Sequence, residues 1–150
     1  MIELGWSAPL TRVDAGTAQR GIRWQHQRIR ELLAKAKAVA DSALDGDAES
    51  SAAVAGIIAD LHSTMEAHLS FEERVLLPLL AEDARAGLDR ATRLKDEHKH
   101  QREVLSAIER EAWAQPQLPT LAAKLAFLTS WLLADMEEEE RSFLSGEIAP

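Results

Sequence analysis

The two halves of the chain carry the same arrangement of side chains that can bind metal ions. Each half offers one isolated histidine and, further along, a pair of ligand-type residues four positions apart. The candidates are His26, His68 and Glu72 in the first half and His98, Asp135 and Glu139 in the second. Residues four apart share one face of a helix, so each pair can direct two ligands to one point. The repeat predicts a metal centre if the fold brings both halves together.

Each of these groups also has a simpler explanation when it is considered alone. A lone histidine on an apolar stripe is often a core residue, and His68 with Glu72 could be a pair on a helix surface. Asp135 and Glu139 lie in an acidic stretch, and acidic stretches are usually solvated helix faces. A common location for all six groups favours metal binding instead, because buried carboxylates need a compensating positive charge.

The composition favours a helical protein and excludes several kinds of chemistry. The 150 residues suit one domain, 46% of them are hydrophobic, and Gly is scarce. The chain has no Cys and no Tyr, which excludes disulfides, thiolate metal ligands and tyrosyl radicals. The net charge of −8 argues against nucleic acids and anionic membranes as partners. No apolar run approaches the ~18 residues of a membrane span, and we expect a cytoplasmic protein.

Four amphipathic helices are predicted after an irregular N-terminal arm, residues 1–16, which contains Trp6. The spacing of apolar residues places the helices at about residues 17–43, 51–80, 83–113 and 119–144. The breaks are Asp45-Gly46-Asp47, a segment around Pro116 and the short stretch after Leu80. Long helices with short connections predict an all-α, up-down-up-down four-helix bundle over residues 17–145.

The candidate ligands fill gaps in the apolar stripes, and the helix lengths place them at one depth. His98, for example, interrupts a stripe that runs from Leu88 to Ile108. His26 and His68 each lie about 17 residues from the turn that joins their helices, roughly 25 Å at ~1.5 Å per residue. The candidate ligands of the third and fourth helices also lie at matching distances from the turn that joins those helices. All six groups are therefore predicted to meet at one level inside the bundle.

Three imidazoles with three carboxylates suit first-row metals such as iron or manganese, and such sets occur in di-metal helix bundles. Calcium alone would not need the histidines. His62 and His100 point to other sectors and are predicted to lie at the surface. Glu73 could swing in as an extra ligand or pair with a neighbour. Arg102, one turn beyond His98, could pair with a carboxylate or extend to water.

Nearly the whole chain, from about residue 6 to 144, resembles the hemerythrin-like, or HHE cation-binding, domain family. The resemblance rests on His26, His68-x-x-x-Glu72-Glu73, Glu97-His98, the Glu-rich stretch after Asp135, and Trp6. It implies a four-helix bundle around a di-iron centre with an oxo or hydroxo bridge, with manganese as an alternative. The positions that match family ligands are His26, His68, Glu72, His98 and Glu139. Glu72 and Glu139 would be the bridging carboxylates.

Two positions depart from the family pattern. Asp135 stands where the family usually carries His, and Arg102 stands four residues after His98, where this chain lacks a second His. Oxygen-transport hemerythrins are richer in histidine than this chain. We expect the carboxylate-rich set to stabilise the ferric state, which disfavours reversible dioxygen carriage and favours oxidation, sensing or iron handling. The other interpretation is a site that has lost one metal or all metal.

The resemblance implies a metal-binding protein that responds to dioxygen, peroxide, nitric oxide or iron itself. A sensory output would pass through a homodimer or an unknown protein partner. The alternatives are a peroxidase-like or ferroxidase-like enzyme at the same centre, and a metal-free interaction bundle. A ferritin-like subunit fits less well, because ferritin-like helices use Glu-x-x-His, whereas this chain uses His-x-x-x-Glu.

Overall fold

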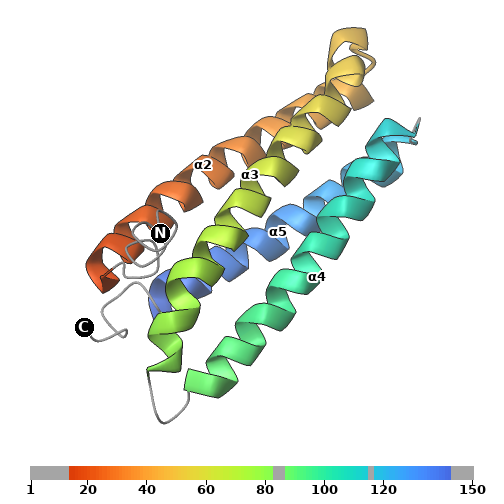
Figure 1. The fold of residues 1–150 in the computed structure, drawn as a ribbon. Helices are drawn as coiled ribbons and strands as arrows, with labels where there is room; N and C mark the ends of the chain where they lie inside the picture. The colour runs from red at the N-terminus through yellow and green to blue at the C-terminus, as the bar shows by residue number, and fades with distance from the viewer. Residues whose placement is uncertain (1–13, 83–86, 115–116, 143–150) are drawn as a thin grey trace, which may run out of the picture.

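The computed structural model describes residues 14–82, 87–114 and 117–142, which form four long helices (Figure 1). Helix α2 runs over Ala15–Leu44, α3 over Ala48–Ala81, α4 over Gly87–Trp113 and α5 over Leu118–Ser142. The predicted bounds agree with these to within a few residues. Trp6 and most of the predicted N-terminal arm lie outside the described residues.

Local sequence signals set where α2 and α3 begin and how they are joined. Asp14 caps α2 by accepting a hydrogen bond from the backbone N–H of Thr17 at 2.8 Å. Asp47 caps α3 in the same way through the N–H of Ser50, at 2.9 Å. Gly46 has a φ of 97°, a left-handed conformation that glycine adopts without a steric penalty. The resulting tight turn makes α2 and α3 antiparallel neighbours.

The helices form an up-down-up-down bundle in which consecutive helices are neighbours (Figure 1). Helix α2 also packs against α5, so the ring of neighbours is closed, with α2 diagonal to α4 and α3 diagonal to α5. The α2–α3 pair is the most closely packed, and the α4–α5 pair is the most open. The described residues thus confirm the predicted all-α four-helix bundle, with one seam that is less tightly closed.

A buried polar layer divides the hydrophobic core in two. The larger part fills the end of the bundle near the α2–α3 turn and includes Leu61 and Leu128. The smaller part, which includes Ile22 and Leu76, fills the opposite end. Between them lie the buried polar side chains of His26, His68, Glu72, His98, Gln101 and Glu139. The core therefore positions these groups by packing against them from above and below.

The prediction is wrong for one residue that was expected to face the core. Leu88, which the apolar pattern of the third helix places on its inner face, is 79% exposed. The buried row of α4 runs through Gly87, Leu94, His98 and Gln101 instead. Leu88 follows Gly87 directly, and successive helix residues are turned about 100° from each other. Its side chain therefore faces solvent.

The outer helix faces carry a few large exposed apolar side chains, among them Trp24, Trp113 and Phe127. Among the residues that the structure describes, no helix combines the length and the apolar character needed to cross a membrane.

Candidate metal centre

Three histidines and two glutamates from all four helices meet in the polar layer. They are His26 of α2, His68 and Glu72 of α3, His98 of α4 and Glu139 of α5, and none is more than 4% exposed. Ligand atoms of four of them lie within 4.8 Å of one another; the four are His26, His68, Glu72 and Glu139. This spacing allows a single ion to contact all four residues.

The Nε2 atoms of the three histidines face carboxylate oxygens. His26 Nε2 lies 3.0 Å from Glu139 Oε1. His68 Nε2 lies 3.2 Å from Glu72 Oε2, and His98 Nε2 lies 3.0 Å from Glu72 Oε1. The two oxygens of Glu72 thus face histidines from the two halves of the chain. This carboxylate occupies the middle of the layer.

The other ring nitrogen of each histidine, Nδ1, is held by a hydrogen-bond acceptor. The acceptors are Glu140 for His26, Gln25 for His68 and Glu73 for His98, at 2.7, 2.7 and 2.9 Å. A proton on Nδ1 leaves the lone pair of a neutral imidazole on Nε2, where it meets carboxylate oxygens that are also acceptors. Facing acceptors require a cation or a proton between them. Ligating histidines in metal sites show this same outer hydrogen bond.

The pKa shifts of the two buried carboxylates, and an unpaired oxygen of one of them, indicate that the layer needs a positive charge. Burial opposes the ionisation of Glu72, but the facing histidines outweigh it and hold the pKa of this carboxyl well below its usual range. Burial, together with the charge of Glu72, raises the pKa of Glu139 well above its ordinary value. Among the described residues, the buried Oε2 of Glu72 has no hydrogen-bond partner. A cation bound beside it would satisfy this oxygen, so the residues present fit a metal ion.

The histidines differ in how strongly they are stabilised as cations. Burial lowers the pKa of His26, although Glu140 acts against this effect. Burial also disfavours the charged form of His98, but Glu72 and Glu73 outweigh it and raise its pKa. The two histidines therefore lie in different electrostatic surroundings.

Asp135 lies at the edge of the centre. Its half-buried carboxylate accepts a hydrogen bond from Gln101 Nε2 at 3.0 Å, and burial raises its pKa. His98 and Asp135 both lie outside the group of four that gathers within 4.8 Å. The structure thus brings four of the six predicted ligands tightly together. It joins His98 to them through Glu72 and leaves Asp135 paired with Gln101.

Several side chains that act at this centre were not among the predicted ligands. Gln25, Gln101 and Glu140 each contact a predicted ligand directly. Glu73 pairs with Arg102, which is one of the two possibilities expected for it, and it also holds the ring of His98. Glu73 and Glu140 each directly follow a glutamate of the polar layer, and this Glu-Glu pair is the sequence signal that could have identified them.

The two histidines excluded from the predicted site lie away from it. His62 is half-buried and contacts Glu109 at 2.7 Å, whereas His100 is exposed and lies against the ring of Trp131.

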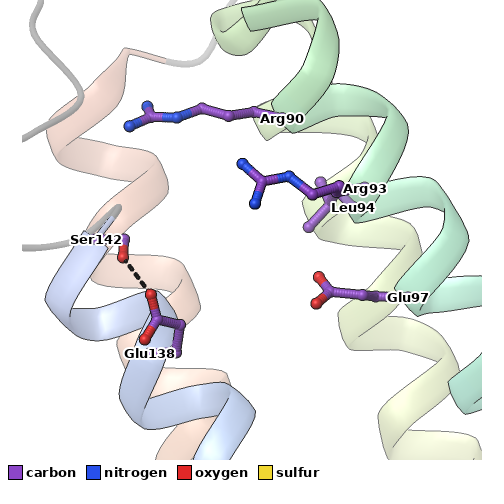
Figure 2. Close-up of a pocket in the computed structure, with 6 residues that line it drawn as sticks. All are labelled: Arg90, Arg93, Leu94, Glu97, Glu138 and Ser142. Carbon is purple, nitrogen blue, oxygen red and sulfur yellow. Dashed lines mark hydrogen bonds between the residues drawn. The ribbon is translucent and has the colours of Figure 1, made fainter. Parts of the chain in front are cut away.

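A pocket of about 170 Å³ opens at the seam between α4 and α5 (Figure 2). It is lined by Arg90, Arg93, Leu94 and Glu97 of α4 and by Glu138 and Ser142 of α5. Figure 2 shows the side chains of Arg93 and Glu97 extending into the space between the two helices.

One residue that lines this pocket, Glu97, lies at the level of the metal centre along the bundle. The contact between Gln101 and Asp135 sets the register of the two antiparallel helices. Glu97 lies one turn before Gln101, and Glu139 lies one turn after Asp135, so Glu97 and Glu139 are at the same depth. The pocket therefore overlaps the metal centre in depth, although none of the six residues that line it is a predicted ligand.

The comparison with known protein families agrees with this geometry. The model of the hemerythrin HHE cation binding domain matches residues 17–145. No curated protein and no solved structure gives a significant match. The family match includes all four helices and every residue of the polar layer. The chain therefore belongs to the hemerythrin HHE cation-binding domain family.

Proposed function

We propose that this protein binds two transition-metal ions in the polar layer and uses them to sense or handle dioxygen, peroxide, nitric oxide or iron. The observation that carries the proposal is the arrangement of three buried histidines, each with Nδ1 held by an acceptor and Nε2 facing a carboxylate. Membership of a cation-binding family supports it.

The proposed ligands divide between two positions. His26, His68 and Glu139 would hold the first ion, and His98 and Asp135 would hold the second, with Glu72 shared. Glu139, the other bridging carboxylate that the resemblance implies, is assigned to the first position because it faces His26. Sharing by Glu72 is supported by its two oxygens, which face His68 and His98 respectively. Asp135 would exchange its bond with Gln101 for the metal, either directly or through a water molecule.

Iron is the metal that we propose, with manganese as the alternative. A set of imidazole and carboxylate donors without thiolate suits both ions. When bound, the metal would supply electron transfer and a coordination position for a small ligand. The protein supplies three carboxylates, whose negative charge favours the more highly charged ferric state.

We propose that a small ligand enters through the α4–α5 pocket, because this pocket overlaps the centre in depth. The charged residues that line the pocket are two arginines, Arg90 and Arg93, and two glutamates, so the lining has no formal net charge in a chain of net charge −8. This access also favours a second candidate function, peroxidase-like or ferroxidase-like turnover, because a cavity of about 170 Å³ admits peroxide but no large substrate. Consumption of hydrogen peroxide together with an electron donor would distinguish the enzyme from a sensor.

The experiment that tests the proposal is metal analysis of the purified chain, before and after anaerobic loading with iron(II), with an absorption spectrum in air. We expect about two iron ions per chain, as in other di-metal helix bundles. The Glu72→Gln variant should lose bound iron, because its amide cannot bridge as a carboxylate does. The Glu103→Gln variant, which changes an exposed glutamate of α4, should bind as the unaltered chain does.

A different result would identify the third possibility. If the loaded chain holds no stoichiometric metal, the proposed metal function is wrong. Asp135 would then mark a lost site, and the protein would act as a metal-free interaction bundle.

A further inference from the structure

The structure contains the same three-residue arrangement twice. In each copy, an arginine follows a central histidine by four positions, and a glutamate of the adjacent helix lies between the two side chains. We call each copy a clasp: the first consists of His26, Arg30 and Glu140, and the second of His98, Arg102 and Glu73. Residues four apart lie on one helix face, so each histidine and its arginine can hold a common acceptor.

The first clasp joins α2 to α5. Glu140 Oε2 accepts a hydrogen bond from His26 Nδ1 at 2.7 Å and another from Arg30 at 2.9 Å. A single carboxylate oxygen is thus fixed from two directions. The arginine neutralises the glutamate while the glutamate orients the imidazole.

The second clasp joins α4 to α3 and repeats this geometry. Glu73 Oε2 accepts from His98 Nδ1 at 2.9 Å and from Arg102 at 2.7 Å. Arg102 also donates to the other oxygen of Glu73 at 3.0 Å and to Glu66 at 2.9 Å. Among the described residues, Glu66 shares Arg102 with Glu73 but makes no hydrogen bond with His98.

Helix geometry explains why paired glutamates build the clasps. Glu73 directly follows Glu72, and Glu140 directly follows Glu139. Successive residues are turned about 100° on a helix. The first glutamate of each pair therefore enters the polar layer, while the second reaches the neighbouring helix and holds its histidine.

We propose that Glu73 and Glu140, held by Arg102 and Arg30, are positioning residues that fix the ring orientation and the tautomer of two metal-binding histidines. This inference rests on the proposed function. Donation of Nδ1–H to a carboxylate keeps the lone pair on Nε2 and makes it a better donor to a metal. His68 provides an internal contrast, because its Nδ1 is held by the neutral amide of Gln25.

The test compares the two glutamates of the clasps with control glutamates that hold no histidine. Iron(II) affinity is measured by competition with a chromogenic chelator for Glu73→Gln and Glu66→Gln, and likewise for Glu140→Gln with Glu137→Gln as the exposed control on α5. Outer-shell changes of this kind typically weaken metal binding 10–100-fold. We expect losses of about that size for Glu73→Gln and Glu140→Gln, and no significant change in either control.

A second measurement does not require a metal. Nitrogen-15 NMR of the imidazole rings in the metal-free protein, in alkaline buffer, should show His26 and His98 as Nδ1–H tautomers. Glu73→Gln should perturb the ring signals of His98, whereas Glu66→Gln should leave them in place.

The outcomes separate the two proposals. Equal iron affinities across each pair of variants, with unchanged ring signals, would overturn the positioning role while metal binding stands. If the unaltered chain binds no iron but the ring signals respond as expected, the proposed function is wrong and the positioning of the histidines is supported.

Discussion

Glu72 is the side chain on which both halves of the centre depend. It is completely buried, and its two oxygens face His68 and His98. A buried carboxylate is costly unless a cation or hydrogen-bond donors surround it. Glu72 therefore makes the metal-free layer costly, and it is also the residue that can join two metal positions.

The contribution of Asp135 can be tested with a substitution that preserves its contact. In Asp135→Asn, the amide oxygen can still accept the hydrogen bond from Gln101, but the negative charge is lost. We expect metal content to fall from about two ions per chain to about one, because the group of four around His26 remains. Asp60→Asn, on the exposed face of α3, is the control. Retention of two ions in Asp135→Asn would show that this residue is no ligand.

Sequence analysis could identify the central residues because a polar side chain that interrupts an apolar stripe must enter the core. This argument placed His26 and Glu139, which are 113 positions apart, at one level of the bundle, and the structure has them in contact. It could not identify Gln25, which approaches the centre from the flank of its helix, whereas Gln101 interrupts the buried row of α4 and could have been found by the same argument. Whether a flanking side chain reaches a neighbour depends on how each helix is rotated, and the spacing of apolar residues does not fix this.

A glycine of α2, Gly21, leaves room for the ring of Phe71 of α3 near the centre. A Cβ atom at Gly21 would lie 3.0 Å from the ring of Phe71, which directly precedes Glu72. Gly56 of α3 has open space around the corresponding position. Glycine thus has a packing role at one site, whereas at the other it only lowers helix stability.

The two glycines should respond differently to alanine. Gly56→Ala should raise the free energy of unfolding by about 0.5–1 kcal/mol, because alanine favours the helix. Gly21→Ala gains the same helix term but forces Phe71 to move, so we expect a smaller gain or a loss. Denaturant titration of the metal-free variants checks both. Equal stabilisation would mean that the Phe71 ring moves aside at no cost.

Helix positions were predictable because periodicity and turn residues act locally. Asp45-Gly46-Asp47 ends one helix and caps the next, as the sequence indicates. Leu88 was misplaced because the apolar pattern of α4 permits two neighbouring faces. Only the packing of the whole helix against its neighbours selects between them.

The polar layer separates two hydrophobic cores along the length of the bundle. The larger core contains most of the buried apolar residues, and the smaller one fills the end of the bundle opposite the α2–α3 turn. Without a cation, the layer holds glutamates whose pKa values are displaced in opposite directions. Metal binding would join the two cores across this layer.

Metal removal should therefore lower the melting temperature. A ligand present at 100 times its dissociation constant stabilises the folded state by ~2.7 kcal/mol. For a domain of this size that corresponds to roughly 5–10 °C. Differential scanning calorimetry before and after chelation measures the difference, and Glu72→Gln should be insensitive to the chelator. An unchanged transition in the unaltered chain would contradict a structural role for the metal.

The clasp between α2 and α5 also has a consequence for biosynthesis. It joins His26 to Glu140, which are separated by 114 positions in the chain. A ribosome adds roughly 5–20 residues per second, so His26 is synthesised several seconds before its partner. Until α5 has emerged, the nascent chain lacks both Glu139 and the residue that orients His26. A metal centre that includes Glu139 can therefore form only after α5 has been synthesised, and fragments that end before α5 cannot assemble it.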